Sequence, residues 1–306
     1  MKTVKIKNQI VPALVQGCMR IDEMSEQEVE QLIRFDLEHG INFFDHADIY
    51  GGGVCEVKFG NVLKKHPELR DQMIIQSKCG IHRSKTNHYD FSKDYILTCV
   101  NESLERLQTD HLDYLLLHRP DALMEPKEVQ EAFNQLYNEG KVKHFGVSNQ
   151  NRFQMELMQK DLQFPIEINQ MQMSVLHTPM IDAGINVNTF EGRGVDRDNG
   201  TIEYCRLNDI TMQCWSPFQY GMFEGVFLNN EKFPEVNKVI DQLAEKYNVI
   251  NSTIAVAWLL RHPANMQVIY GSVHTNRIAE LVKACNFTLT REEWYAVYTA
   301  AGNLLP

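Results

Sequence analysis

Short apolar segments alternate with longer amphipathic segments along most of the chain. Short apolar runs bounded by turn residues are typical of buried strands, and longer segments with apolar positions three to four residues apart are typical of helices. The pattern therefore predicts strands that alternate with helices. The expected strands are residues 14–19, 41–45, 72–78, 112–118, 142–148, 165–170, 210–215 and 266–270.

The segments between these strands carry helix start and stop signals. Ser25 and Glu28 have the spacing of a capping box, Gly40 follows that helix, and Ser92 precedes another. A β-hairpin is expected over residues 2–11, and the long segment 177–199 reads as a loop. The predicted helices are residues 25–39, 56–65, 92–107, 126–139, 150–160, 201–207, 234–247, 252–261, 275–284 and one from about residue 291.

Alternating strands and helices allow a doubly wound sheet or an eightfold barrel. Polar residues end successive expected strands, as a barrel requires, because its active site is the ring formed by those ends. A doubly wound sheet concentrates its site at one switch point instead. We therefore predict an α/β fold, a (β/α)8 TIM barrel with an N-terminal β-hairpin and an extra C-terminal helix. The polar strand-end residues are Asp45, Lys78, His118, Ser148, Asn149, Gln170, Trp215, Gly271 and Ser272.

Composition narrows the function classes. The chain has 306 residues, 43% of them hydrophobic, and a net charge of −10, which gives no reason to expect nucleic acid as a partner. No change of composition marks a linker, so a single domain over residues 1–306 is expected. The N-terminus lacks a signal-peptide pattern and no apolar run is long enough to span a bilayer, so we expect a cytoplasmic protein with no membrane partner. The seven cysteines are scattered without paired spacing, which indicates reduced thiols and no metal site.

One stretch, from Gly40 to Gly53, combines a strand end with unusual polar chemistry. An apolar run leads to Asp45, Tyr50 follows five residues later, and three consecutive glycines end the stretch. A carboxylate and a phenol near a buried strand end need partners. Taken alone, the stretch fits equally well an aspartate that caps a turn and a tyrosine that covers the core.

The barrel prediction brings Asp45, Tyr50, Lys78 and His118 to one ring. An ammonium beside a phenol favours the phenolate, and a carboxylate holds that ammonium in place. With an imidazole to share the proton, Tyr50 can act as a general acid towards a carbonyl oxygen and as a base in reverse. Lys78 could instead be a solvated lysine or a Schiff-base lysine, as in barrel aldolases, and His118 a core histidine. A nucleophilic Ser148 lacks the glycine-flanked elbow.

Six blocks in order carry a resemblance. They are Gly40-Ile-Asn-Phe-Phe-Asp-His-Ala-Asp-Ile-Tyr-Gly51, Leu107 to His118, Gly146-Val-Ser-Asn149, Asn169-Gln170, Trp215-Ser-Pro217 and Gly271-Ser-Val-His-Thr-Asn-Arg277-Ile278. These blocks occur in order and together cover nearly the whole chain. As a set they resemble the sequence blocks of the aldo-keto reductase superfamily, and they are most similar to those of a group of bacterial reductases. The resemblance implies an NADPH-dependent carbonyl reductase on a TIM barrel.

The resemblance also implies residue roles. Asp45, Tyr50, Lys78 and His118 match the catalytic tetrad of the family, with Tyr50 as proton donor. The residues that match cofactor positions are Ser148, Asn149 and Gln170 at the carboxamide, Trp215 on the nicotinamide ring, Ser216 near the pyrophosphate, and Gly271, Ser272, Arg277 and Glu280 at the adenosine end. Asp113, His46 and Asp48 lie near these motifs and are assigned structural or supporting roles.

Two departures from the family pattern affect the expected cofactor preference. Many members carry a basic residue where this chain has Gly271, and asparagine where it has Leu281. A preference for NADPH over NADH therefore depends mainly on Arg277 and on donors over residues 272–275. Little sequence follows the last helix, so we expect an open substrate pocket shaped by Met19, Arg20, Tyr50, His118, Phe218 and the 177–199 loop.

Three functions remain in competition at this stage. The first is reduction of a small-molecule aldehyde or ketone by a monomer or weak oligomer. The second is a cofactor-binding interaction module, since the potassium-channel β subunits share this barrel. The third is a Schiff-base aldolase, which requires no nicotinamide. The sequence leaves open the carbonyl substrate and the physiological direction.

Overall fold

The structure, a computed structural model, describes residues 1–306. Its eight parallel strands form a closed barrel in the order β10-β11-β12-β3-β4-β5-β8-β9. This confirms the predicted α/β barrel. The doubly wound alternative is wrong, because a doubly wound sheet is open and has two edge strands whereas this barrel is closed. The strands are β3 Leu14–Gly17, β4 Phe43–Asp45, β5 Ile74–Cys79, β8 Leu112–Leu117, β9 Val142–Ser148, β10 Ile166–Gln172, β11 Thr211–Trp215 and β12 Gln267–Tyr270.

The chain divides into two compact units. One comprises residues 15–170 and 271–275, and the other comprises residues 1–14, 171–270 and 276–306. The prediction of a single domain is not decided by this division, and each unit is described by itself.

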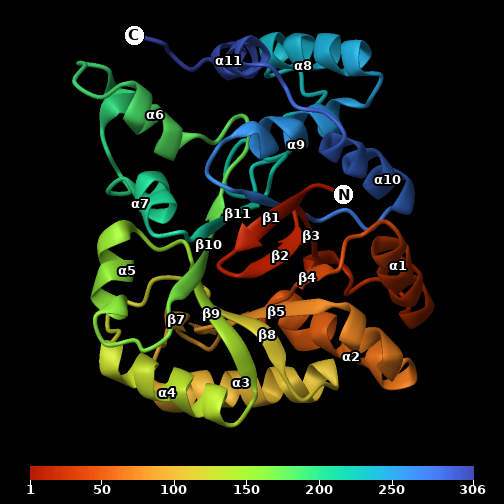
Figure 1. Cartoon of the computed structure of the whole chain (residues 1–306), viewed down its shortest axis with the longest axis vertical. Helices are drawn as coiled ribbons and strands as arrows, with labels where there is room; N and C mark the ends of the chain where they lie inside the picture. Colours follow the sequence, from red (N-terminus) through yellow and green to blue (C-terminus); the bar gives the residue numbers. More distant parts are fainter. The chain divides into compact units, whose positions relative to one another are not determined.

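The unit of residues 15–170 and 271–275 contains strands β4, β5, β8 and β9, which pair in parallel. Its helices begin and end close to the expected positions, and the capping box of Ser25 and Glu28 is present. In Figure 1, α3 and α4 run beside each other along the outer side of β8 and β9. The helices are α1 Glu26–Glu38, α2 Val54–Lys65, α3 Lys93–Leu107, α4 Pro126–Asn138 and α5 Arg152–Gln159.

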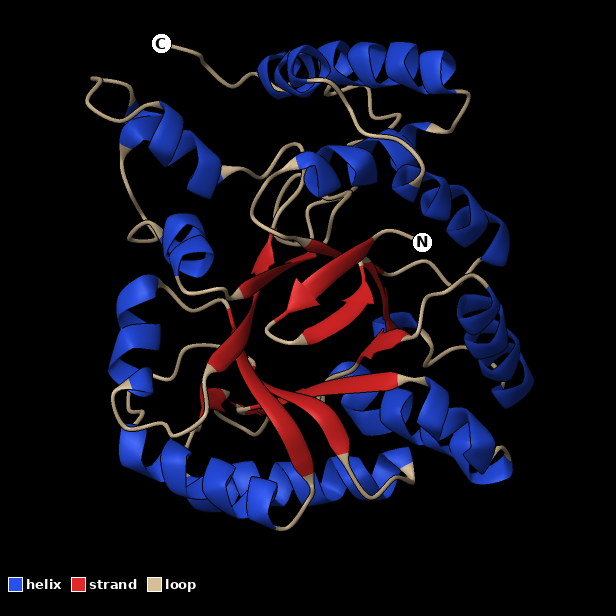
Figure 2. Ribbon diagram, in the orientation of Figure 1, coloured by secondary structure: helices blue, strands red, loops and turns tan.

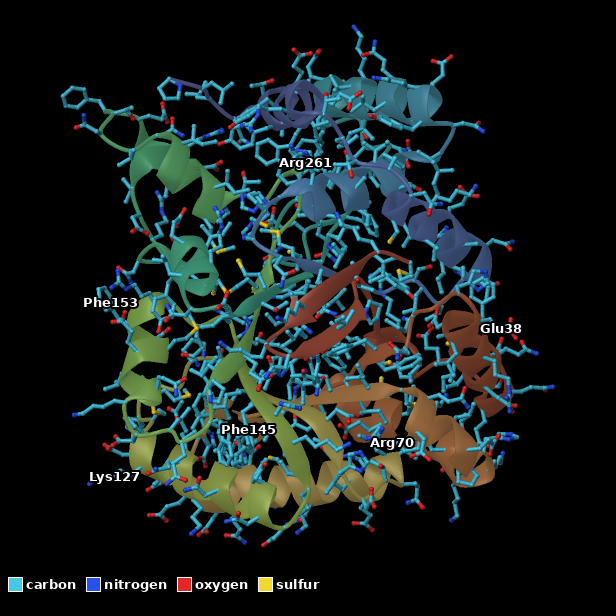
Figure 3. All side chains as sticks on the ribbon, in the orientation of Figure 1. Glu38, Arg70, Lys127, Phe145, Phe153 and Arg261 are labelled. Atoms are coloured by element: carbon cyan, nitrogen blue, oxygen red, sulfur yellow. The ribbon has the colours of Figure 1, made fainter.

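The core of this unit follows from strand alternation. Figure 3 labels Phe145 on β9, which is buried and stacks on Phe133 of α4 with 4.0 Å between ring centroids. Phe153, also labelled, lies on α5 and is exposed. Aromatic stacking between a strand and its covering helix stabilises the layer of helices on the strands.

The other unit contains the predicted hairpin, β1 Thr3–Ile6 and β2 Gln9–Pro12, which pair antiparallel. The predicted additional C-terminal helix is α11, Arg291–Ala300, and it packs against α8. Figure 2 shows this unit to be rich in helices. They are α6 Pro179–Ile185, α7 Thr201–Leu207, α8 Pro234–Tyr247, α9 Asn251–Arg261, α10 Thr275–Val282 and α11.

The expectation of a structureless loop over residues 177–199 is partly wrong. The segment contains α6 and a 3-10 turn at Gly192–Gly194. Asp182 of α6 accepts hydrogen bonds from the hydroxyls of Thr178, at 2.9 Å, and Tyr298, at 2.6 Å. Because Tyr298 is far away in the chain, the local pattern could not reveal this support.

A second small hairpin, β6 Ile81–His82 with β7 His88–Tyr89, was also not predicted. All seven cysteines are free thiols and six are buried, which confirms the reading of reduced core thiols. None of the helices has the length and apolar character needed to cross a membrane.

Candidate active site

Asp45 ends strand β4 and is only 2% exposed. The chain then turns through a 3-10 helix at Tyr50–Gly53. Gly51, Gly52 and Gly53 all have positive φ, at 56°, 66° and 93°. Three successive left-handed residues require glycine, because a side chain is strained in this region of the backbone map. The glycine triplet therefore sets the backbone directly after Tyr50.

Lys78 lies on β5 and is 1% exposed. Its Nζ donates to Asp45 Oδ1 and to the backbone carbonyl of His46, both at 2.6 Å, and lies 4.8 Å from the centroid of the Tyr50 ring. Burial alone lowers the pKa of Lys78, but Asp45 and Tyr50 outweigh it, so the pKa lies above its ordinary value. Lys78 is therefore an ammonium group between a carboxylate and a phenol.

The phenol of Tyr50 is protonated at neutral pH. Burial raises the pKa of Tyr50 to about 12, although Lys78 lowers it and hydrogen-bonds to the hydroxyl. Lys78 acts in the expected direction, towards the phenolate. The pKa of Tyr50 is nevertheless raised overall, because the loss of water around the phenol has a larger effect than the charge of Lys78.

His118 follows β8, and its imidazole meets the Tyr50 ring edge-on, with 6.2 Å between centroids. Burial lowers the pKa of His118 well below its ordinary value, and the charges of Lys78, Arg119 and Arg83 lower it further. Its Nδ1 is buried without a hydrogen-bond partner. The structure thus brings together Asp45, Tyr50, Lys78 and a neutral His118.

Polar groups at the ends of β9 and β10 form a second cluster. Asn149 Nδ2 donates to Ser148 Oγ at 2.7 Å, and Ser148 Oγ donates to the carbonyl of Gln170 at 2.9 Å. Amide and hydroxyl groups of this kind match the donors and acceptors of a carboxamide. The chemistry of this donor set therefore fits a nicotinamide.

Two contacts to Asp45 were not anticipated from the sequence. Asp45 Oδ1 accepts hydrogen bonds from Gln76 Nε2 at 2.6 Å and from Gln170 Nε2 at 3.0 Å. Gln76 could have been found, because it lies two residues before Lys78 and strand alternation places both on one face. Gln170 was predicted to lie in the same ring of strand ends, but the sequence does not show which residues of that ring contact each other.

Asp113, His46 and Asp48 were predicted to have supporting roles, and they are not among the side chains that donate hydrogen bonds to Asp45. Asp113 accepts hydrogen bonds from Arg70, labelled in Figure 3, and from the backbone N–H of Ile75, both at 2.9 Å. His46 is fully buried, and burial lowers its pKa to about 3. Burial raises the pKa of Asp48 to about 7. Asp113 is thus held by hydrogen bonds to neighbouring strands and loops, His46 is a buried neutral imidazole, and Asp48 is a titratable group of the same unit.

Gly271 and Arg20 are neighbours. An ideal Cβ built at Gly271 lies 3.8 Å from Arg20 Nε. Arg20 belongs to the 3-10 turn Cys18–Arg20 after β3. Met19 lies in the same turn and is 40% exposed. The carbonyl of Ser272 accepts a hydrogen bond from Gln16 Nε2 at 3.3 Å. The guanidinium of Arg20 therefore lies within van der Waals contact of a Cβ at position 271.

The remaining predicted site residues belong to the other unit. Trp215 ends β11, and its ring lies 6.5 Å from that of Phe223. Ser216 follows with φ of 53°, and the carbonyl of Phe218 accepts from the N–H of Phe227. Arg277 lies on α10.

Glu280 of α10 has two partners within that unit. Its carboxylate pairs with Lys283 at 2.6 Å, and its carbonyl accepts a hydrogen bond from the hydroxyl of Thr253. The predicted roles of Glu280 and of the other site residues of this unit stay predictions.

Comparisons with known proteins define the class. The profile of the Aldo/keto reductase family matches residues 13–300. Oxidoreductase YdhF of Escherichia coli (strain K12) is 35% identical, over 91% of this chain and 89% of its own. A 6-dehydroglucose reductase of Agrobacterium fabrum (strain C58 / ATCC 33970) is 33% identical, over 94% of this chain and 93% of its own. An aldo/keto reductase from Klebsiella pneumoniae, solved with NADP and acetate, has a TM-score of 0.77 at 22% identity, covering 100% of this chain and 97% of its own.

These matches identify an oxidoreductase on a parallel barrel. The chain belongs to the aldo/keto reductase family. It is an NAD(P)H-dependent enzyme that acts on small carbonyl compounds, and the match to YdhF confirms the predicted similarity to bacterial reductases.

Proposed function

We propose that this enzyme uses NADPH to reduce an aldehyde or ketone to an alcohol, with Tyr50 as the proton donor. The observation that carries the proposal is Lys78, whose ammonium is held between Asp45 and the phenol of Tyr50. A fixed cation beside a buried phenol stabilises the phenolate that remains after proton transfer.

Each residue of the tetrad then has a distinct role. Tyr50 gives its proton to the carbonyl oxygen and takes it back when the reaction runs in reverse. Lys78 stabilises the negative oxygen left on Tyr50, and Asp45 holds Lys78. His118, neutral and edge-on to Tyr50, positions the carbonyl oxygen by a hydrogen bond.

A nicotinamide cofactor, when bound, would supply hydride chemistry at this site. We assign Ser148, Asn149 and Gln170 to its carboxamide, because the side chains of Ser148 and Asn149 hydrogen-bond to each other and Ser148 donates to the backbone carbonyl of Gln170. Their hydrogen bonds with one another orient the donors before a ligand binds. We assign the remaining positions by family resemblance: Trp215, Ser216, Ser272, Arg277 and Glu280.

A preference for NADPH over NADH requires positive charge at the 2′-phosphate. Arg277 supplies one guanidinium, which can bind a phosphate by two hydrogen bonds. Arg20 lies beside Gly271, where many relatives carry a basic side chain, but we assign it to the substrate pocket and not to the 2′-phosphate. The Klebsiella pneumoniae protein of similar fold was solved with NADP, which is consistent with this choice.

We propose that the substrate pocket is open and involves Met19, Arg20, Tyr50 and His118, and the role of Phe218 stays a prediction from the sequence. We also propose that residues 1–306 act as one domain in a monomer or weak oligomer. One relative is a 6-dehydroglucose reductase, so sugar aldehydes belong among the first compounds to be tested.

The competing functions have less support. A Schiff-base lysine must be a free amine, whereas Lys78 is an ammonium with bonds to Asp45 and to the carbonyl of His46. A binding module without turnover does not require Asp45, Tyr50, Lys78 and His118 to be buried together. Burying these polar groups costs free energy, which a catalytic role explains.

The test is a panel of aldehydes and ketones, including sugar aldehydes, assayed with NADPH and with NADH. We expect the wild type to consume NADPH with at least one of them, and Tyr50→Phe to lose that activity while it still binds NADPH, as measured by fluorescence. Equal rates for the two proteins contradict the role of Tyr50. Borohydride trapping of a substrate on Lys78 without nicotinamide binding favours the aldolase.

A further inference from the structure

Gln76 is a buried polar residue that the mechanism above does not use. It lies on β5, has no exposed surface, and is the direct register partner of Asp45 across the β4–β5 ladder. Lys78 follows two residues later on the same face of the strand. Gln76 and Lys78 therefore approach the same carboxylate from one strand.

Both donors bind the same oxygen of Asp45. Gln76 Nε2 and Lys78 Nζ each lie 2.6 Å from Oδ1. A buried carboxylate has no water to disperse its charge, so protein donors must do so. Hydrogen bonds to an ionised acceptor are stronger than neutral ones, which makes this amide an effective part of the charge balance.

Three other buried glutamines of the barrel strands have different partners. The Nε2 of Gln16 donates to the carbonyl of Gly17 at 2.9 Å, that of Gln213 to Gln267 Oε1 at 3.0 Å, and that of Gln267 to the carbonyl of Pro12 at 2.7 Å. Their acceptors are all uncharged. Gln170 shares the contact to Asp45 but is assigned to the cofactor, so Gln76 is the remaining amide donor to this carboxylate.

We propose that Gln76 is a positioning residue that tunes the proton donor Tyr50 through Asp45 and Lys78. Its amide N–H disperses part of the negative charge of Asp45. The carboxylate then cancels less of the electric field that the Lys78 ammonium exerts at Tyr50. This inference rests on the proposed function of Tyr50. It predicts that removal of the amide makes the phenol of Tyr50 harder to ionise.

The supporting electrostatics have the required sign. The charge of Asp45 raises the pKa of Tyr50, and the charge of Lys78 lowers it. A donor that disperses the charge on Asp45 therefore acts on the same side as Lys78. Only part of the hydrogen-bond energy reaches Tyr50, so we expect a shift of about half a unit to one unit.

The experiment replaces Gln76 by Met, which keeps the length and removes the donor, and by Val as a second variant suited to a strand. Alcohol oxidation with NADP⁺ is followed against pH, because this direction requires the phenolate. We expect the rise of kcat to move to higher pH by about half a unit to one unit, with KM for NADP⁺ unchanged. Gln213→Met is the control and leaves the profile in place, because Gln213 is equally buried and its amide donates to Gln267 Oε1.

A readout that needs no turnover separates this inference from the proposed function. Fluorotyrosine is incorporated and the Tyr50 resonance is assigned by its loss in Tyr50→Phe. The ¹⁹F titration of Gln76→Met then shifts to higher pH than that of wild type. Superimposable titrations of wild type and both Gln76 variants overturn the proposal, whether or not a substrate is found. Absence of NADPH-dependent turnover with a shifted titration contradicts only the proposed function.

Discussion

The imidazole of His118 meets the phenol ring of Tyr50 edge-on, with an interplanar angle of 83°. This arrangement places a neutral ring beside the phenol, because burial and the charge of Lys78 hold the pKa of His118 well below its ordinary value. His118 therefore carries no positive charge that could compete with Lys78 for the phenolate.

A prediction about pH follows for His118. Since burial and nearby positive charges hold its folded pKa well below the ordinary value, His118 is neutral at neutral pH and contributes no inflection to kcat/KM near pH 6.5. We expect His118→Gln to lower kcat/KM by about 100-fold and to keep the shape of the wild-type profile. An inflection common to both proteins belongs to another group, such as Asp48, whose pKa is about 7. Loss of an inflection near pH 6.5 in the variant contradicts a neutral His118.

The buried pair of Lys78 and Asp45 predicts a result for stability that differs from the result for activity. Lys78→Met leaves a carboxylate buried without its cation, and we expect a loss of about 3–5 kcal/mol in the free energy of unfolding. Asp45→Asn combined with Lys78→Met removes both charges and recovers most of that loss. Neither protein reduces substrate, because Tyr50 lacks its cation. Urea unfolding and NADPH consumption measure the two effects.

A double variant that stays as unstable as Lys78→Met contradicts the charge explanation. It then indicates that the length of the lysine side chain, and not its charge, supports the barrel interior.

His46 predicts a pH dependence of stability. Burial lowers its pKa to about 3 in the folded protein, whereas an unfolded histidine titrates near 6.5. Between these values the unfolded chain binds a proton and the folded chain does not, so stability falls as the pH falls. From pH 6.5 to 4.5 we expect wild type to lose about 2–3 kcal/mol more than His46→Leu. Urea unfolding at both pH values measures this, and parallel losses contradict it.

The sequence predicted the barrel well because its signals are local. Strand β9 and helices α7 and α8 have the expected bounds, since apolar runs, Pro at a helix start and turn residues mark them. The strand ends also identified Asp45, Lys78 and His118 as neighbours. The clustering of those residues required only the alternation of side chains and the closure of the barrel.

What the sequence could not predict depends on contacts between distant segments. Asp182 of helix α6 accepts a hydrogen bond from Tyr298, and the hydrogen bond from Gln170 to Asp45 joins residues 125 positions apart. The net pKa of Tyr50 was also out of reach, because it is the balance of burial and the charge of Lys78. Local spacing gives the sign of the charge effect but not the extent of burial.

Close packing of α2 against α3 predicts unequal costs for two glycine substitutions. An ideal Cβ at Gly60 lies 2.1 Å from the backbone oxygen of Arg106 and 2.7 Å from the carbonyl carbon of Leu107. Backbone cannot move aside as a side chain can, so we expect Gly60→Ala to lower the free energy of unfolding by about 3 kcal/mol or more. At Gly52, with φ of 66°, nothing lies within 4 Å, so Gly52→Ala costs only about 1 kcal/mol of backbone strain. Urea unfolding of the two variants measures the difference, and equal losses contradict a helix contact that depends on the missing side chain of Gly60.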